Sequence, residues 1–547
     1  MSDFGVLSLL PPLLAIILAI WTKRVILALF SGVWVGGVMV SGWNPITGTT
    51  QTLQWILFSV TSAWKENGNI VTDLWNTKIL LFDFLIGAGV GLIYKSGGAF
   101  AIGQALANRV RTSRGASILG WLLGVLIFFD DYTNTIIVGN TMRPITDRAR
   151  VSREMLAYID DSTAAPVAGL AVVSTWIGYE VGLIGDSFSK LQNADLASVG
   201  GAYGAWMHSV PYRFYSILAI ILVLIVAYTH RHYGSMLHAE YRTRTENKVL
   251  RDGASPMMTT EADLGMPKDN GNAHFFIWPL LTLIFVTLYG MWHTGGGTAA
   301  YAKGGLMGVL GNSDSALALL WGSFAMVVVA FILVVGTKKM TIEEAENAMV
   351  RGMKQMVIAN TILVMAWSIK QATDAVGTAP YIVSLAKAAG VSGSWIPLIV
   401  FLIAMFISFT TGTSWGTFSI MLPIAIPLTY GITGRIGPEL FASIGAVFAG
   451  GIFGDHCSPI SDTTIMSSMF SGSDHIDHVR TQVPYAMTAS GVGIVLYLLF
   501  GLGIHSWAIL LPVGFMLLVG VWYLLSEWYG RRYGIPHGRV PVYVVDE

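Results

Sequence analysis

The sequence predicts an all-α polytopic membrane protein that contains two repeats of inverted topology. Of its 547 residues, 54% are hydrophobic and only 12% are charged, about half the charged share of a typical soluble protein. Apolar runs of bilayer-spanning length, such as 214–228 and 508–525, recur along the whole chain and often carry Trp, Tyr or Phe at their ends. These features exclude a soluble or single-span protein. They predict about eleven transmembrane helices, two re-entrant hairpins and two broken helices.

The first half begins with the run 6–22, which lacks a preceding basic region and is therefore expected to be a span rather than a cleaved signal peptide. Further spans are expected at 25–42, 79–94, 155–185 and 210–230. The apolar run 116–147 is different, because the polar stretch FFDDYTNT (128–135) interrupts it. A straight spanning helix would bury this stretch at high cost, whereas a hairpin would keep its turn surrounded by protein.

A charged segment rich in Gly and Pro, 231–272, is interpreted as a mostly mobile cytoplasmic linker. The spans expected after it are 273–291, 314–336, 356–373, 440–470, 482–504 and 508–527. The run 395–430, interrupted by SFTTGTSWGT, is interpreted as the second re-entrant hairpin. The predicted units are a first transmembrane repeat (1–230), the linker (231–272), a second inverted repeat (273–504), and a final transmembrane helix with a cytoplasmic tail (505–547).

The distribution of basic residues supports both hairpins. With the N-terminus outside and both hairpins returning to the side they enter from, 24 of the 32 Lys and Arg residues fall in cytoplasmic loops and six in outside loops. This asymmetry follows the positive-inside rule. It predicts an N-terminus outside and a C-terminus inside. The expected location is the cytoplasmic (inner) membrane of a prokaryote.

Short segments of the two halves also match in the same order. PLLAIILAI (12–20) resembles PLLTLIFVT (279–287), LALFSG resembles LALLWG, and VPYRFYSI resembles VPYAMTAS. Each match is weak alone, but the shared order indicates an internal repeat. Five crossings and one hairpin in each half make the second half enter from the opposite face, which predicts inverted repeats.

Two polar segments are expected to break helices inside the membrane. In GDHCSPISDTT (454–464), the glycines Gly450, Gly451 and Gly454 are expected to loosen the helix, and Pro459 removes a backbone donor. The counterpart in the first half is YIDDSTAAPVAG (158–169). In carriers with inverted repeats, the substrate site lies near the midplane, where such half-helix ends meet.

The hairpin tips and the helix breaks are therefore expected to form one ion- or substrate-binding site. Its candidate residues are Asp130, Asp131, Thr133, Asn134, Thr135, Asp161, Ser162, Thr163, Thr411, Thr413, Ser414, Asp455, His456, Ser458, Ser461, Asp462 and Thr463. Among them, Asp455 and Asp462 are the expected Na⁺ ligands. A buried carboxylate can hold either a proton or Na⁺, and competition for it couples the two ions.

Other ionisable residues receive a structural interpretation. His456 is interpreted as a hydrogen-bonded packing residue rather than a ligand, and Asp83 as a structural residue that bridges helices or caps one. Glu180 and Lys370 are interpreted as solvated groups near helix ends, with Lys370 as an alternative counter-charge for the cavity. A zinc site at Asp455, His456 and Cys457 is disfavoured, because consecutive residues point in different directions.

The two polar regions resemble the signatures of the NhaC family of Na⁺/H⁺ antiporters, within the wider ion-transporter superfamily. GTSWGTFSIMLPIAIPL (412–428) and GDHCSPISDTTIMSS (454–468) are similar to the second-half signature. DDYTNTIIVGNTMRPITDR (130–148) with DDSTAAPVAG (160–169) is similar to the first-half signature. The resemblance implies Na⁺-coupled exchange, an inverted-repeat fold and an elevator-like movement. Members of this family also move organic solutes, including malate against lactate and some amino acids.

The preferred function is Na⁺/H⁺ antiport by competition at intramembrane carboxylates. The alternative is a Na⁺-coupled transporter of an organic anion or amino acid on the same scaffold. A channel is disfavoured because no helix has a continuous polar lining, and an enzyme because Ser, His and Asp are adjacent in GDHCSP rather than arranged around a pocket. No cofactor is expected beyond the transported Na⁺ and H⁺. The expected partners are these ions, an organic solute under the alternative, membrane lipid and, from the resemblance, a second copy of the chain; no nucleic acid is expected.

Overall fold

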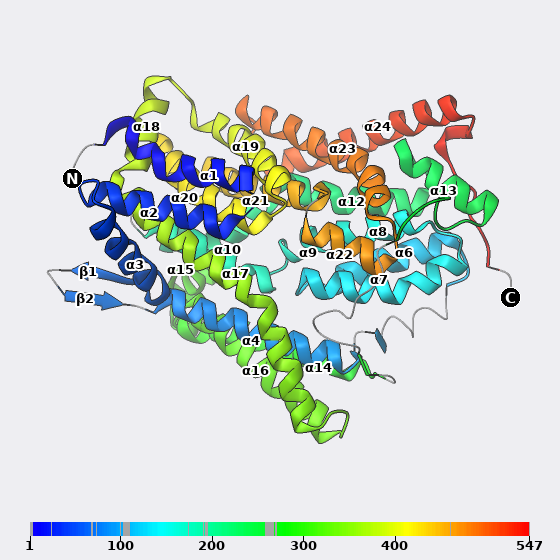
Figure 1. Cartoon of the computed structure of the whole chain (residues 1–547), viewed down its shortest axis with the longest axis horizontal. Helices are drawn as coiled ribbons and strands as arrows, with labels where there is room; N and C mark the ends of the chain where they lie inside the picture. Colours follow the sequence, from blue (N-terminus) through cyan, green and yellow to red (C-terminus); the bar gives the residue numbers. More distant parts are fainter. Residues whose placement is uncertain are drawn as a thin grey trace.

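The computed structural model is almost entirely helical, and its termini lie at opposite ends of the long axis (Figure 1). It describes residues 4–22, 24–66, 69–72, 74–98, 100–101, 110–172, 174–189, 191, 195–256, 267–268, 271–459 and 461–545; for some of these it describes only the backbone. The strands described are β1 (Ala63–Glu66) and β2 (Asn69–Thr72), which pair antiparallel. The 3₁₀ helices described are η1 (Gly5–Leu9), η2 (Leu196–Val199), η3 (Val210–Tyr212), η4 (Gly393–Trp395) and η5 (Pro536–Gly538).

The α-helices of the first part of the chain are α1 (Leu10–Thr22), α2 (Val25–Val40), α3 (Pro45–Thr61), α4 (Trp75–Lys95), α6 (Ser113–Leu126), α7 (Asp131–Arg148), α8 (Arg153–Thr163), α9 (Ala165–Ala168), α10 (Thr175–Phe188), α11 (Gly201–Ser209), α12 (Phe214–Thr229) and α13 (Gly234–Glu246). Those of the second part are α14 (His274–Thr294), α15 (Gly297–Asn312), α16 (Ser315–Gly336), α17 (Ile342–Val376), α18 (Thr378–Ala388), α19 (Ile396–Thr411), α20 (Ser414–Thr433), α21 (Pro438–Cys457), α22 (Asp462–Ser471), α23 (His475–Gly501) and α24 (Trp507–Tyr533).

The polytopic membrane class predicted from the sequence is confirmed. Eight helices of the described part of the chain are long and apolar enough to span a bilayer, or nine if the bent pair Gly201–Tyr212 and Phe214–Thr229 forms one span. Other predicted spans consist of shorter pieces. The expected span 155–185, for example, falls on three helices, α8, α9 and α10. The expected span 356–373, by contrast, is only part of the 35-residue α17. The count of about eleven spans stays a prediction.

Both predicted hairpins are pairs of antiparallel helices. α21 runs antiparallel to α20, because Thr429 bonds to Ser443 at one end and Ser414 bonds to Asp455 at the other. α21 runs parallel to α19, since Ser458 Oγ donates to the Phe409 carbonyl (2.8 Å) and Gly450 packs against Ala404. α19 and α20 therefore form a hairpin whose tip is at residues 412–413.

The first half repeats this arrangement. α8 runs parallel to α6, with Gly120 against Ile159 and Gly124 against Thr163. It runs antiparallel to α7, with the Asn134 amide on the Thr163 carbonyl (2.9 Å) and Gly139 next to Asp160. α6 and α7 therefore form the corresponding hairpin, whose tip is at residues 127–130. Whether either hairpin is re-entrant stays a prediction.

The two broken helices cross in opposite directions near the centre of the protein. Arg153, at the start of α8, donates to the Gly472 carbonyl just after α22 (3.1 Å). Ser162 near the end of α8 bonds to His456 in α21 (2.9 Å), and Gly169 packs against Ile452. This antiparallel crossing is the relation that inverted repeats require. The predicted boundaries of the repeats stay a prediction.

Part of the segment predicted to be a mostly mobile linker is a packed helix. Residues 234–246 form α13, and Leu237 of this helix packs against Ile535 and Val540 of the C-terminal tail. Glu240 accepts a hydrogen bond from the Ser152 backbone at the start of α8 (2.7 Å). The prediction is wrong for this part, because apolar and polar contacts to two other segments hold α13 in place. Residues 257–266, 269 and 270 of the predicted linker lie outside the described residues.

Candidate functional site

The break between α21 and α22 lies next to the carboxylate of Asp455. α21 ends at Cys457, Ser458 has extended backbone, and α22 begins at Asp462. Pro459 lies between them and lacks the N–H group that a continuing helix would use. The break therefore falls inside the segment where the sequence predicts it.

The glycines before this break have a different role from the predicted one. α21 remains helical through Gly450, Gly451 and Gly454. A Cβ atom at Gly450 would lie 2.7 Å from the Phe401 carbonyl oxygen, and one at Gly454 would collide with the backbone of Phe409. The prediction that these glycines loosen the helix is wrong. They allow α19 to approach α21 closely, since glycine has no Cβ.

Three hydroxyl groups surround the Asp455 carboxylate. Ser414 Oγ donates to Oδ2 (2.9 Å), Ser461 Oγ donates to Oδ1 (2.6 Å), and Thr463 Oγ1 lies 3.4 Å from Oδ1. Ser414 is the first residue of α20 and Ser461 is the N-cap of α22, so two helix N-termini point at the carboxylate. All four side chains are buried. The cluster therefore places hard oxygen ligands from three helix ends around one acidic group.

Two residues of α8 approach this cluster from the first half. The Gln482 amide donates both to Asp161 Oδ2 (2.6 Å) and to the His456 carbonyl. Ser162 Oγ bonds to His456 Nε2 (2.9 Å), and Tyr215 OH bonds to its Nδ1 (2.5 Å). Both ring nitrogens of His456 are thus engaged, which agrees with its interpretation as a packing residue. The histidine joins α8, α12 and α21.

Asp455, His456 and Cys457 face different partners. The Cys457 thiol donates to the Phe453 carbonyl of its own helix (3.0 Å), whereas Asp455 faces the three hydroxyls and His456 faces Ser162 and Tyr215. The three side chains do not converge on one point, as a zinc site would require.

At the first hairpin tip, Asn134 connects the ends of α6 and α8. Its amide nitrogen donates to the carbonyls of Gly124 (2.6 Å), Ile127 (3.0 Å) and Thr163 (2.9 Å). The first two carbonyls belong to the end of α6, and the third lies at the end of α8. These bonds tie the first tip to the break in α8, and not to Asp455.

The remaining predicted residues mostly satisfy backbone groups or lie near the tips. Four hydroxyls donate to main-chain carbonyls: Thr135 to Tyr132, Thr163 to Ile159, Thr411 to Ile407, and Ser458 to Phe409. Thr413 is the N-cap of α20, and Asp130 and Asp131 are buried at the first tip. The side chains of Thr133 and Asp462 lie outside the described residues, so the Na⁺ ligation predicted for Asp462 stays a prediction.

Glu180 is not solvated, contrary to its sequence interpretation. Its carboxylate pairs with Arg213 (Nη1 to Oε2, 2.8 Å), and both side chains are 1% exposed. The Arg213 guanidinium also lies over the rings of Trp206 (4.8 Å) and Phe448 (4.0 Å). The interpretation of Glu180 as a solvated group is wrong, because the fold buries Glu180 and Arg213 together as an ion pair.

Lys370 is also buried, and it has acidic partners outside the Asp455 cluster. Its ammonium group lies 3.2 Å from Asp374 and 3.7 Å from Asp186. The solvated interpretation of Lys370 is therefore wrong. The ammonium group is the counter-charge of these two acids rather than of the Asp455 cluster.

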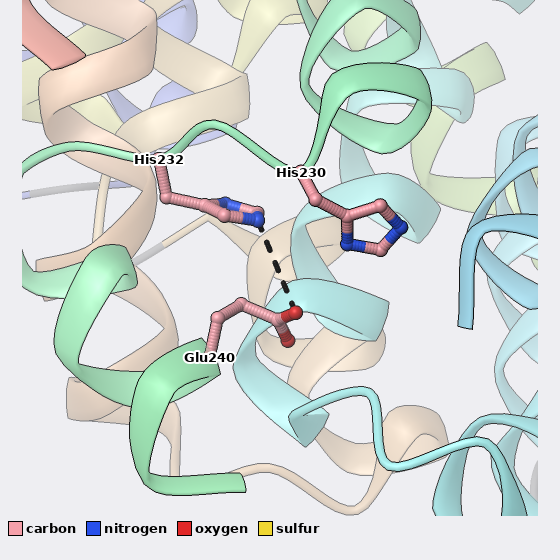
Figure 2. A group of neighbouring side chains, drawn as sticks. All are labelled: His230, His232 and Glu240. Atoms are coloured by element: carbon pink, nitrogen blue, oxygen red, sulfur yellow. Dashed lines mark ion pairs between the residues drawn. The ribbon is translucent and has the colours of Figure 1, made fainter. Parts of the chain in front are cut away.

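A further polar cluster lies just after α12, where nitrogen and oxygen atoms of His230, His232 and Glu240 come within 4.8 Å of one another (Figure 2). Arg244 already contacts two of the three residues. Its Nη2 donates to Glu240 Oε2 (2.9 Å) and lies 3.3 Å from His230 Nδ1. A metal ion bound to these atoms would have to displace the guanidinium. The backbone of both histidines also pairs with the tail, through Val540 and Gly538 (2.9 Å each).

We expect this contact with the tail to weaken in acid. Burial, followed by the neighbouring Arg244, lowers the pKa of His232 to about 3, and burial and His232 lower the pKa of His230 to about 3. Because a released histidine has a pKa of about 6.5, the contact is fully stable above about pH 6.5 and weakens as the pH falls toward 3. Near pH 5 the loss is on the order of 2 kcal/mol per histidine.

Hydrogen exchange of the amides of residues 536–545, corrected for intrinsic rates, measures this effect. We expect faster exchange at about pH 5 than at about pH 7.5. A His230→Asn/His232→Asn variant should lose this pH dependence. Equal pH dependence in the variant and the unchanged protein would contradict the assignment to the histidines.

Comparison with known proteins adds evidence independent of this geometry. Residues 167–502 match the family model described as the Na⁺/H⁺ antiporter family. An uncharacterized protein of Haemophilus influenzae is 35% identical over 91% of this chain and 92% of its own length. Two named relatives match smaller parts. The malate-2H⁺/Na⁺-lactate antiporter of Bacillus subtilis is 29% identical, and the Na⁺/H⁺ antiporter NhaC of Alkalihalophilus pseudofirmus is 28% identical; each match covers 29% of this chain and 33% of the relative.

Proposed function

This chain belongs to the Na⁺/H⁺ antiporter family, and on that premise we propose that it exchanges Na⁺ for H⁺ across the cytoplasmic membrane by competition at Asp455. It is a multi-pass membrane protein whose named relatives are antiporters rather than enzymes. The observation that carries the proposal is the meeting of Ser414, Ser461 and Thr463 at the Asp455 carboxylate, remote from solvent.

This cluster suits a site with two alternative occupants. A proton on Asp455 neutralises the carboxylate and leaves the surrounding hydroxyls hydrogen-bonded. Na⁺ neutralises the same group and takes the hydroxyl oxygens around Asp455 as ligands. An unneutralised carboxylate is costly at this depth. Entry of one ion therefore favours departure of the other.

The breaks of the two halves are coupled through hydrogen bonds. Gln482 binds Asp161 and the backbone of His456 together, and His456 is next to Asp455 in sequence. A change in the occupant of Asp455 is therefore transmitted to α8. This connection supports coupling between the ion site at Asp455 and the broken helix of the first half.

The second candidate is Na⁺-coupled transport of an organic anion or amino acid. The observation that favours it is the similarity to an antiporter whose name includes malate and lactate. Recognition of an organic anion would be helped by a guanidinium group at the site. Arg213, however, is already paired with Glu180. Na⁺/H⁺ exchange is therefore preferred. The outside position of the N-terminus, the inside position of the C-terminus and a homodimeric state are proposed with it.

The dependence of Na⁺ affinity on pH tests the proposal. If one proton competes with Na⁺, the apparent dissociation constant should rise about tenfold for each pH unit below the pH at which the site takes up its proton. The measurement is calorimetric titration of the purified protein with Na⁺ between about pH 6 and pH 9, without organic solute. A constant affinity over this range would exclude competition and favour the solute carrier.

A further inference from the structure

A second group of buried oxygen atoms lies where α8 meets α22. It consists of both carboxylate oxygens of Asp160, Oδ1 of Asp161, and the hydroxyls of Ser467 and Ser471. Each of these atoms is buried and has no hydrogen-bond partner among the described residues. The four side chains are at most 1% exposed. None of the three hydroxyls around Asp455 belongs to this group.

The four side chains face one another across two antiparallel helices. The Ser471 hydroxyl faces the Asp160 carboxyl group, and the Ser467 hydroxyl faces that of Asp161. Ser467 and Ser471 are one helical turn apart in α22, so both lie on the same side of that helix. Asp160 and Asp161 are adjacent in the last turns of α8.

Gly139 of α7 closes the group from a third side. A Cβ atom at this position would lie 3.0 Å from Asp160 Oδ2 and 2.7 Å from the Cβ of Phe470. Any other residue would therefore push into the space beside Asp160. α7, α8 and α22 together surround the oxygens, and none of the three is part of the second hairpin.

The described side chains leave the negative charge of this group uncompensated. Arg153 is paired with Asp147 (3.0 Å) and donates to the Gly472 carbonyl, and the Arg143 guanidinium also lies beside Gly472, one residue after Ser471. Neither arginine forms an ion pair with Asp160. His478 lies 3.8 Å from Asp161 Oδ2 and also bonds to Gln482 (2.6 Å). Buried carboxylates without a counter-charge are strongly unfavourable.

We propose that Asp160, Asp161, Ser467 and Ser471 form a second binding site for Na⁺, separate from the hydroxyl cluster of Asp455. Two carboxylates and two hydroxyls offer only hard oxygen ligands, and a monovalent cation between them removes most of the unfavourable charge. The site joins α8 of the first half to α22 of the second half, so its occupancy holds the two broken helices together. The identity of the bound ion as Na⁺ rests on the proposed function, in which Na⁺ is the transported ion.

The number of Na⁺ ions bound per chain tests the proposal. Equilibrium dialysis of the purified full-length protein with radioactive Na⁺, near pH 8.5 where proton competition is weak, should give two ions per chain. Asp160→Asn should reduce this number to one, and Ser471→Ala should weaken one of the two sites about tenfold. The matched control is Asp195→Asn, which changes an exposed acid outside both sites and should leave two ions bound.

The outcomes separate this inference from the proposed function. Asp455→Asn should also reduce the number to one, and a double variant with Asp160→Asn should bind none. If the unchanged protein binds one ion, and only Asp455→Asn removes it, the second site is overturned while the proposed function stands. If Asp160→Asn removes an ion and Asp455→Asn does not, the second site stands and the proposed function fails. Displacement of one of the two Na⁺ ions by stoichiometric Ca²⁺ would overturn the monovalent assignment. Ser471→Ala keeps the test decisive if Asp160→Asn does not fold.

Discussion

Replacing Asp455 by Asn is expected to abolish Na⁺-dependent transport while the protein still folds. Asn keeps the shape of the side chain and can still bond to Ser414 and Ser461, so packing is preserved. The negative charge that holds Na⁺ is lost. Removal of one partner of a buried charge pair costs about 3–5 kcal/mol, which corresponds to a loss of affinity of more than about 100-fold.

Uptake of Na⁺ into proteoliposomes under an imposed pH gradient measures this effect. Size-exclusion chromatography and thermal unfolding in detergent establish that the variant is folded. Asp195→Asn is the control, since it also removes one acid from the chain but lies on the surface. A folded Asp455→Asn protein with undiminished Na⁺-dependent transport would reduce Asp455 to a structural cap.

The second large effect is expected for stability, at the ion pair of Glu180 and Arg213. Arg213→Leu leaves the carboxylate of Glu180 buried without its counter-charge. It also removes bonds from the guanidinium to the Gly169 carbonyl and to Ser209 Oγ. The expected loss is about 3–5 kcal/mol, enough to lower the midpoint of thermal unfolding clearly or to prevent expression.

The double variant Glu180→Leu/Arg213→Leu distinguishes loss of the ion pair from loss of packing. Replacement of both charges removes the uncompensated carboxylate, so the double variant should be more stable than Arg213→Leu alone. Thermal unfolding of the three proteins in the same detergent provides the comparison. A double variant less stable than Arg213→Leu would mean that Glu180 stabilises the fold through its hydrogen bond from Trp206 Nε1, and that the uncompensated carboxylate is not the main cost.

Local chemistry in the sequence was sufficient to predict several features of the site. Pro459 removes a backbone donor, and the helix ends two residues before it. The polar tips at 128–135 and 408–417 coincide with the turns of the two hairpins. These predictions succeed because each depends on residues that are neighbours in the chain. The prediction for Gly450 and Gly454 was wrong for the opposite reason. The role of these glycines depends on how closely another helix approaches them, which residues nearby in the chain do not determine.

The sequence by itself determined the membrane class, the two polar breaks and the presence of oxygen ligands near them, because hydropathy and helix-breaking residues act locally. The tertiary structure decided which of these ligands meet. Ser414 is 41 residues from Asp455, and Gln482 is 321 residues from Asp161, yet each pair is hydrogen-bonded. The tertiary structure also pairs Glu180 with Arg213 and places Ser471 opposite Asp160. Such partners depend on the crossing of helices, which is set by side-chain packing over the whole molecule and not by the residues beside each group in the chain.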